Sequence, residues 1–175
     1  MRPERKHHPE KGPVIPQVKR GPRRVLVFGI GNPGRGDDGL GPRAAERFEA
    51  LGLPEVTCDA NYQLNIEDSL VCSRHDVVVF VDAARGLRTP FTWTVIRAEA
   101  SVPAMTHALG PGAVLALCEG IYGRKPEAHL LAIRGHRWQV GEGLSVRAEK
   151  NLAEAVRFLE GFVKKAASGK DSRRD

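Results

Sequence analysis

The segment Asp76-Val-Val-Val-Phe-Val-Asp82 is the sequence feature that most constrains the fold. Five consecutive apolar residues, four of them valines, lack the alternation of a half-buried strand and predict a strand buried on both faces. A second run of the same kind, Arg24-Val-Leu-Val-Phe-Gly-Ile-Gly31, ends in glycines. Strands that are buried on both faces need helices on both sides of their sheet, so the two runs predict an α/β protein.

The rest of the chain alternates between strand and helix patterns. Residues 92–97 alternate apolar and polar side chains, which favours an antiparallel or edge strand. The alternation predicts a three-layer α/β/α sandwich with a mostly parallel, twisted sheet of about five strands. Further strands are predicted at 55–58 and 129–134, and helices at 40–51, 66–72, 111–122 and 152–163.

The positive charge of the chain is confined to its ends. The first 24 residues hold eight Lys or Arg against two Glu, and the last twelve hold five against two Asp. The remaining residues carry 14 basic and 17 acidic side chains, so the formal net charge of +6 is not a property of the central region. We therefore expect a disordered, basic, Pro-rich arm at 1–23, a single α/β domain at 24–163 and a disordered basic tail at 164–175.

Several classes of protein are disfavoured by composition. No apolar run approaches the roughly 18 residues that a membrane-spanning helix needs, and no signal-peptide pattern opens the chain. The cysteines Cys58, Cys72 and Cys118 are odd in number, contain no CxxC pair and lie in apolar runs. They are typical of buried, reduced thiols, so we expect a cytoplasmic protein without disulfides or a structural zinc site.

Acidic residues follow two of the predicted strands. Asp37 and Asp38 lie in the glycine-rich loop after the first strand, and Asp82 ends another strand. Ligands of open α/β sheets bind beyond the carboxyl ends of the strands, and neighbouring strands lie about 5 Å apart. These carboxylates can therefore meet in one crevice, where they suit a divalent cation or a general base. His107, in a loop before a helix, adds an imidazole, and such an N,O set suits nickel, zinc or iron.

Each of these residues can also be explained by a structural role instead of a functional one. Asp37 and Asp38 precede a helix, where capping is as good an explanation as ligand binding. For Asp82 the functional interpretation is favoured, and for His107 the two are equal. No functional role is expected for the other histidines, which are His7, His8, His75, His129 and His136.

The glycine loop also matches a dinucleotide-binding pattern. Gly29-Ile-Gly-Asn-Pro-Gly34 satisfies GxGxxG after a strand. However, the third glycine is followed by Arg35, Gly36 and two acidic residues rather than by a helix. Two carboxylates beside a pyrophosphate would repel it, so dinucleotide binding is disfavoured.

Three segments of the sequence resemble the signature segments of the hydrogenase maturation endopeptidases. They are Phe28-Gly-Ile-Gly-Asn-Pro-Gly-Arg-Gly-Asp-Asp-Gly-Leu-Gly41, Val79-Phe-Val-Asp-Ala83 and Thr106-His107. The similarity runs in order over 24–162. The first segment is the most specific, whereas the other two are short and depend on their order.

The resemblance implies a fold, an activity and a set of site residues. The family folds as an α/β sandwich and removes a C-terminal extension from the large-subunit precursor of a nickel–iron hydrogenase after nickel insertion. The residues that match Asp38, Asp82 and His107 contact the nickel that the precursor holds, and some members carry Glu at the Asp38 position. We expect this cation either to polarise the scissile carbonyl or to lower the pKa of a water molecule, with Asp38 or Asp82 as a base.

Two other functions remain open at this stage. Peptidyl-tRNA hydrolases carry a similar Gly-Ile/Leu-Gly-Asn-Pro-Gly turn, but a Thr-Arg-His-Asn run with their catalytic histidine follows it. This chain has Asp37-Asp38 there and no histidine before His75, and an acidic crevice would repel tRNA, so we expect no nucleic-acid partner. A non-enzymatic domain that binds partners through its basic ends is the second alternative. The segment 61–68 is interpreted equally as a precursor-selecting loop or as a helix-capping loop.

Overall fold

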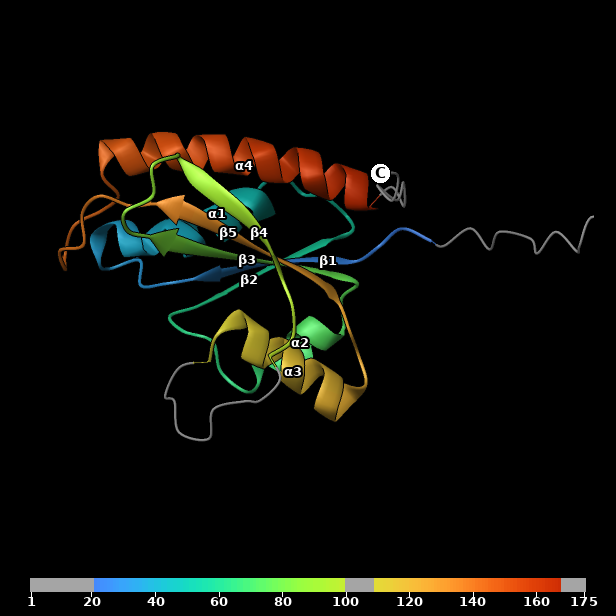
Figure 1. Cartoon of the computed structure of the whole chain (residues 1–175). Coiled ribbons are helices and arrows are strands. Elements are labelled where there is room, and N and C mark those ends of the chain that lie inside the picture. The colour runs from blue at the N-terminus through green and yellow to red at the C-terminus, as the bar shows by residue number, and fades with distance from the viewer. Residues whose placement is uncertain (1–20, 100–108, 168–175) are drawn as a thin grey trace, which may run out of the picture.

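A computed structural model of the chain describes residues 21–99 and 109–167. A five-stranded sheet lies between two layers of helices, with α1 and α4 on one face and α2 and α3 on the other (Figure 1). The predicted α/β sandwich is therefore confirmed. The strands are β1 (Val25–Ile30), β2 (Val56–Asn61), β3 (Val77–Ala84), β4 (Phe91–Ile96) and β5 (Glu127–Arg134). The helices are α1 (Leu40–Glu49), α2 (Asp68–Ser73), α3 (Pro111–Tyr122) and α4 (Val146–Ala167), and a 3-10 turn, η1 (Gly36–Gly39), precedes α1.

The strand order places β1 and β3 side by side near the middle of the sheet. The order is β2-β1-β3-β5-β4, with β1, β2, β3 and β5 parallel and β4 antiparallel to β5 at one edge. The antiparallel edge strand predicted at 92–97 is thus confirmed. Because the chain adds β2 on one side of β1 and β3 on the other, the strand order reverses there, which is where open α/β sheets bind ligands.

The continuous apolar run of β3 is explained by its two faces. Val77, Val79 and Val81 pack with residues of α1 and α4, whereas Val78 and Phe80 pack with residues of α2 and α3. All five side chains are fully buried. Each fully buried Val or Phe side chain contributes about 1.5–3 kcal/mol through the hydrophobic effect, so this strand anchors both layers.

Residues 23 and 164–167, which the sequence assigned to the arm and the tail, make contacts with the domain. Helix α4 continues through 164–167, which was expected to be tail, because Ala166 packs against the core and Lys164 pairs with Glu160. Positive charge in the last turn also complements the helix dipole. At the other end, Arg23 pairs with Glu127 at 2.8 Å and so belongs to the domain. The remaining residues of the expected arm and tail, 1–20 and 168–175, lie outside the described residues.

The three cysteines are free thiols, but only two of them are buried as predicted. Cys72 and Cys118 are buried, and the Cys118 thiol donates a hydrogen bond to the Ser69 carbonyl at 3.2 Å. Cys58 is half-buried; burial, together with the charge of Glu49, raises the pKa of its thiol to about 11. Among the helices described, none combines the length and the apolar character needed to cross a membrane.

Candidate functional site

The glycine-rich loop folds back tightly across the ends of β1 and β3. Gly31 has a φ of +131°, which side-chain-bearing residues rarely adopt, and the backbone carbonyl of Asp38 occupies the space where its side chain would be. Gly41 packs against the carbonyls of Ile30 and Val81, so a side chain at Gly41 would collide with both strands. These two close approaches need glycine, and they set the loop that carries Asp38 against the carboxyl ends of β1 and β3.

Asp38 and Asp82 lie close enough at this edge to influence each other. Asp38 is half-buried and its Oδ2 accepts a hydrogen bond from the backbone N–H of Asn32 at 3.0 Å. Asp82, on β3, is also half-buried, and its Oδ1 accepts a hydrogen bond from the N–H of Ala83 at 2.7 Å. Burial, with a smaller contribution from the negative charge of Asp38, raises the pKa of Asp82 to about 6 against the opposing effect of this hydrogen bond.

This pair of carboxylates is chemically versatile. A carboxyl group with a pKa near 6 can accept or release a proton close to neutral pH, as a general acid or base must. Two neighbouring carboxylates can also supply oxygen ligands to a cation, whose charge would relieve their mutual repulsion.

A third ligand is not found in the described part of the chain. Within 21–99 and 109–167, no three His, Cys, Asp or Glu side chains converge in a way that could hold a metal ion. His107, the third residue of the predicted set, lies outside the described residues. The described chain resumes at Leu109, whose N–H donates to the carbonyl of Leu64 at 3.2 Å, just after β2.

Asp37 has a different environment from its neighbour. It is fully buried, and its carboxylate accepts hydrogen bonds from the backbone N–H groups of His136, Arg137 and Ser145 and from the Ser145 hydroxyl, at 2.6–2.9 Å. Burial acts to raise the pKa of Asp37, but these hydrogen bonds outweigh it and hold the pKa below its usual value. Asp37 therefore fastens the loop between β5 and α4 to the glycine loop, which is neither of the roles expected for it.

The segment 61–68 is also held by a buried carboxylate. Asp68 accepts hydrogen bonds from the Asn65 N–H at 2.7 Å and from the Asn61 side chain at 2.9 Å. Helix α2 begins at Asp68 rather than at Ile66, and Asn65 does not cap it with its side chain. The loop leaves Tyr62 and Ile66 exposed, 70% and 61% respectively, near the carboxyl ends of the strands.

The histidines that were expected to have no function have local partners. His75 Nδ1 is hydrogen-bonded to the Val71 carbonyl, and His129 Nε2 to the Glu127 carboxylate. His136 Nε2 lies 3.3 Å from the side-chain nitrogen of Asn151. All three belong to the packing of the domain. His7 and His8 lie outside the described residues.

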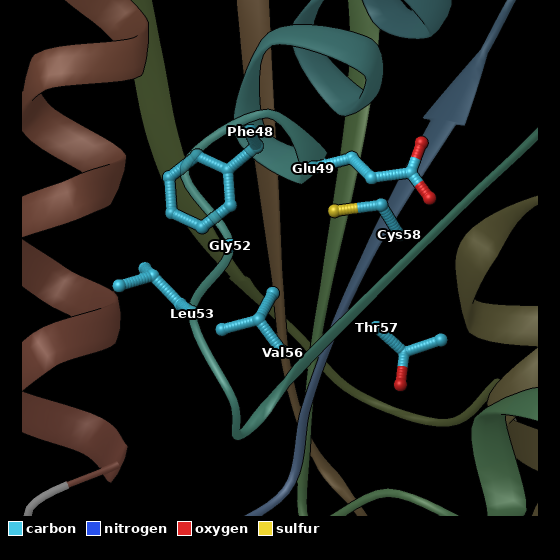
Figure 2. Close-up of a pocket in the computed structure, with 7 residues that line it drawn as sticks. All are labelled: Phe48, Glu49, Gly52, Leu53, Val56, Thr57 and Cys58. Carbon is cyan, nitrogen blue, oxygen red and sulfur yellow. The ribbon is translucent and has the colours of Figure 1, made fainter.

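A separate pocket of about 230 Å³ lies where α1 ends and β2 begins (Figure 2). Phe48, Leu53 and Val56 lie on the side of the pocket toward α4, and Thr57 lies on the other side. None of the predicted site residues contributes to it, so the pocket is distinct from the site of Asp38 and Asp82. Its lining consists of Phe48, Glu49, Gly52, Leu53, Val56, Thr57 and Cys58.

Solved structures with the same arrangement of elements include two hydrogenase maturation enzymes. The maturation protease HycI from Thermococcus kodakarensis aligns over 82% of this chain and 94% of its own, with 22% sequence identity and a TM-score of 0.65. The maturating endopeptidase HybD from E. coli aligns over 81% of this chain and 93% of its own, with 20% identity and a TM-score of 0.63. The chain has the fold of the hydrogenase maturation proteases.

Sequence comparisons alone do not reach this result. The sequence matches no family model and no curated protein. The resemblance inferred from the three short segments is nevertheless confirmed at the level of the fold, because an endopeptidase from Escherichia coli solved in solution also aligns over 81% of this chain, with 24% identity and a TM-score of 0.62. At such identities the whole-chain sequence signal is weak, whereas the likeness of the fold remains clear.

Proposed function

We propose that this protein is an endopeptidase that removes the C-terminal extension of a nickel–iron hydrogenase large-subunit precursor after nickel has been inserted. The observation that carries the proposal is the pair Asp38 and Asp82, which lies at the β1–β3 switch point in the fold of the hydrogenase maturation proteases. The resemblance of the segments around Asp38, Asp82 and His107 to that family supports the same assignment.

In this proposal the metal belongs to the substrate. Asp38, Asp82 and His107 would contact nickel that the precursor carries, so that only a loaded precursor completes the site. Two carboxylate oxygens and an imidazole nitrogen form a donor set that suits nickel. The carboxylates can approach such a cation from the protein side because their own loop and strand already hold them in place. The cytoplasm is the proposed compartment, and the free cysteines support it.

Asp82 is proposed as the proton acceptor of the reaction. Its raised pKa, about 6, makes it more basic than an ordinary aspartate. Once ionised, it can accept a proton from a water molecule that attacks the scissile carbonyl, and it can later return that proton to the leaving amine. The precursor's nickel would polarise the carbonyl or acidify the water, as a Lewis acid does.

Cleavage of a purified precursor tests the proposal. The full chain is incubated with nickel-loaded large-subunit precursor, and the subunit mass is followed by mass spectrometry. We expect a single loss of mass that corresponds to the C-terminal extension, and no loss with the Asp82→Ala variant. A control variant, Glu154→Gln on the exposed side of α4, should cleave as the unmodified chain does. Full cleavage by Asp82→Ala, or none by the unmodified chain, would contradict the proposal.

A further inference from the structure

Trp138 contacts two arginines near the candidate site, one through its ring and one through its backbone carbonyl. The guanidinium carbon of Arg85 lies 4.1 Å from the centre of the Trp138 ring, a cation–π contact. The side chain of Arg35 donates a hydrogen bond to the Trp138 carbonyl at 3.4 Å. The ring packs on Gly135, where a Cβ atom would lie 2.8 Å from a ring carbon. We call Arg35, Arg85 and Trp138 the arginine–tryptophan platform.

The platform borders the carboxylate pair on both of the segments that carry it. Arg35 precedes Asp38 by three residues, and the N–H of Asp38 donates to the Arg35 carbonyl at 3.2 Å. Arg85 follows Asp82 by three residues, directly after the end of β3. The turns after β1, β3 and β5 all lie at the same edge of the sheet (Figure 1). A peptide that extends from Asp38 and Asp82 along these turns can therefore reach the platform.

The loop that carries Trp138 is fixed to the glycine loop. The buried carboxylate of Asp37 binds one end of it, and the N–H of Gly36 donates to the Glu142 carbonyl at 3.0 Å. Near its tip, the N–H of Gly141 donates to the Gly34 carbonyl at 2.9 Å. A partner therefore finds the platform already formed, which reduces the entropy that binding must overcome.

The two segments that hold Arg85 and Trp138 carry more positive than negative charge. The segments 84–90 and 134–145 contain four arginines and one acidic residue, Glu142, which pairs with Arg137 at 3.3 Å. Arg35 and Arg85 are exposed, and neither forms an ion pair with a carboxylate in the part of the chain that the structure describes. A guanidinium that is stacked on an aromatic ring keeps its N–H edge available for a carboxylate.

We propose that the arginine–tryptophan platform binds an acidic side chain of the peptide segment that the precursor presents to Asp38 and Asp82. The identity of this partner rests on the proposed function, whereas the carboxylate-binding chemistry rests on the platform alone. Arg85 supplies the main contact, and Arg35 the second. The site thereby binds opposite charges of its partner at two places: the carboxylate pair attracts a cation, and the platform attracts an anion. A nucleic acid would fit less well, because the carboxylate pair repels its phosphates.

A binding titration tests the platform without any catalysis. Tryptophan fluorescence of the full chain is followed as a short peptide of alternating Glu and Gly, amidated at its end, is added. The matched peptides carry Gln in place of Glu, one amidated and one with a free terminal carboxylate. A Trp138→Phe variant identifies the part of the signal that comes from Trp138 rather than from Trp93.

The Glu peptide should bind at least about tenfold more tightly than either Gln peptide, as expected for charge-assisted hydrogen bonds. Arg85→Gln should weaken its binding by about tenfold, Arg35→Gln should weaken it less, and Arg157→Gln on the exposed side of α4 should leave it unchanged. Equal binding of the Glu and amidated Gln peptides, an equal effect of Arg85→Gln and Arg157→Gln, tighter binding of a single-stranded oligonucleotide, or a preference for the free terminal carboxylate would each overturn the proposal.

Precursor cleavage then separates the two proposals. If the unmodified chain processes the precursor, Arg85→Gln should raise KM by about tenfold with little change in kcat, as lost ground-state binding does. Unchanged processing kinetics in this variant would overturn the platform and leave the proposed function standing. If the unmodified chain cleaves no precursor but Glu-peptide binding depends on Arg85, the platform stands and the proposed function fails.

Discussion

Asp37 and Asp38 are consecutive in the sequence, but the protein uses their carboxylates in opposite ways. Asp37 is fully buried and accepts four hydrogen bonds from residues 136, 137 and 145. Asp38 is half-buried, accepts a hydrogen bond from Asn32, and acts electrostatically on Asp82. The Asp37 carboxylate therefore holds loops together at the edge of the sheet, whereas the Asp38 carboxylate belongs to the candidate site.

Replacing Asp37 by asparagine should destabilise the protein. An amide group offers one acceptor oxygen where the carboxylate has two, and its NH₂ would point at backbone N–H donors that are buried. We expect Asp37→Asn to lower the free energy of unfolding by about 3 kcal/mol, measured by urea denaturation. The same substitution at Asp38 is the matched control and should change stability by less than about 1 kcal/mol. Equal destabilisation by both variants would show that Asp37 is not the fastening residue.

At Asp38 the effect should instead fall on precursor processing. We expect Asp38→Asn to reduce cleavage of nickel-loaded precursor by about a hundredfold or more, because it removes one of the proposed metal contacts. Asp38→Glu keeps the negative charge and the carboxylate oxygens, so it should retain much more activity than Asp38→Asn. Cleavage rates of the two variants measured side by side decide this. Equal activity of the two would argue against a metal contact at Asp38.

The raised pKa of Asp82 predicts a pH-dependent stability. Because the folded-state pKa is about 6 and the ordinary value is 3.8, folding favours the protonated carboxyl group. This stabilising contribution is complete below about pH 4 and is lost as the pH rises through 6. Asp82→Asn, which stays neutral, should therefore increase stability by about 2–3 kcal/mol at pH 8 and hardly at all at pH 4. Urea denaturation at the two pH values measures this change in the free energy of unfolding. An equal effect of Asp82→Asn at both pH values would mean that Asp82 is not desolvated.

His107 is predicted to act in processing but not in folding. His107→Ala should abolish cleavage of nickel-loaded precursor, because it removes the only nitrogen ligand of the proposed set, and should leave the free energy of unfolding within about 0.5 kcal/mol of that of the unmodified chain. His136→Ala provides a comparison, since His136 lies near Asn151 and is assigned to packing. If His107→Ala processes the precursor at the normal rate, the proposed three-residue set is incorrect.

The sequence predicts the layers of this fold well because its strongest signals are local. The apolar run 77–81 directly indicates a strand that is buried on both faces, and the alternation in 92–97 indicates an edge strand. The resemblance of the glycine loop to a family signature predicts Asp38 as a site residue, and the position of Asp82 at the end of a strand predicts it as another. Each of these signals is contained in a few consecutive residues, so no knowledge of distant contacts is required.

Other features depend on contacts between distant parts of the chain. The role of Asp37 is set by Ser145, 108 positions away, and the capping interpretation could not include that partner. Trp138 and Arg85 look unremarkable in sequence, because their stacking exists only after β3 and β5 have been paired. The end of α4 was placed too early because Lys164 and Lys165 were grouped with a charged tail, whereas Ala166 beside them packs against the core.

The most direct test of the central claim compares two forms of one precursor. Nickel-loaded and nickel-free large-subunit precursor are incubated with the protein under the same conditions, and the mass of the subunit is measured over time. The account predicts that the nickel-loaded form loses its C-terminal extension and that the nickel-free form stays intact, because Asp38, Asp82 and His107 engage the metal that the substrate brings. Cleavage of both forms at the same rate, or of neither, would contradict it.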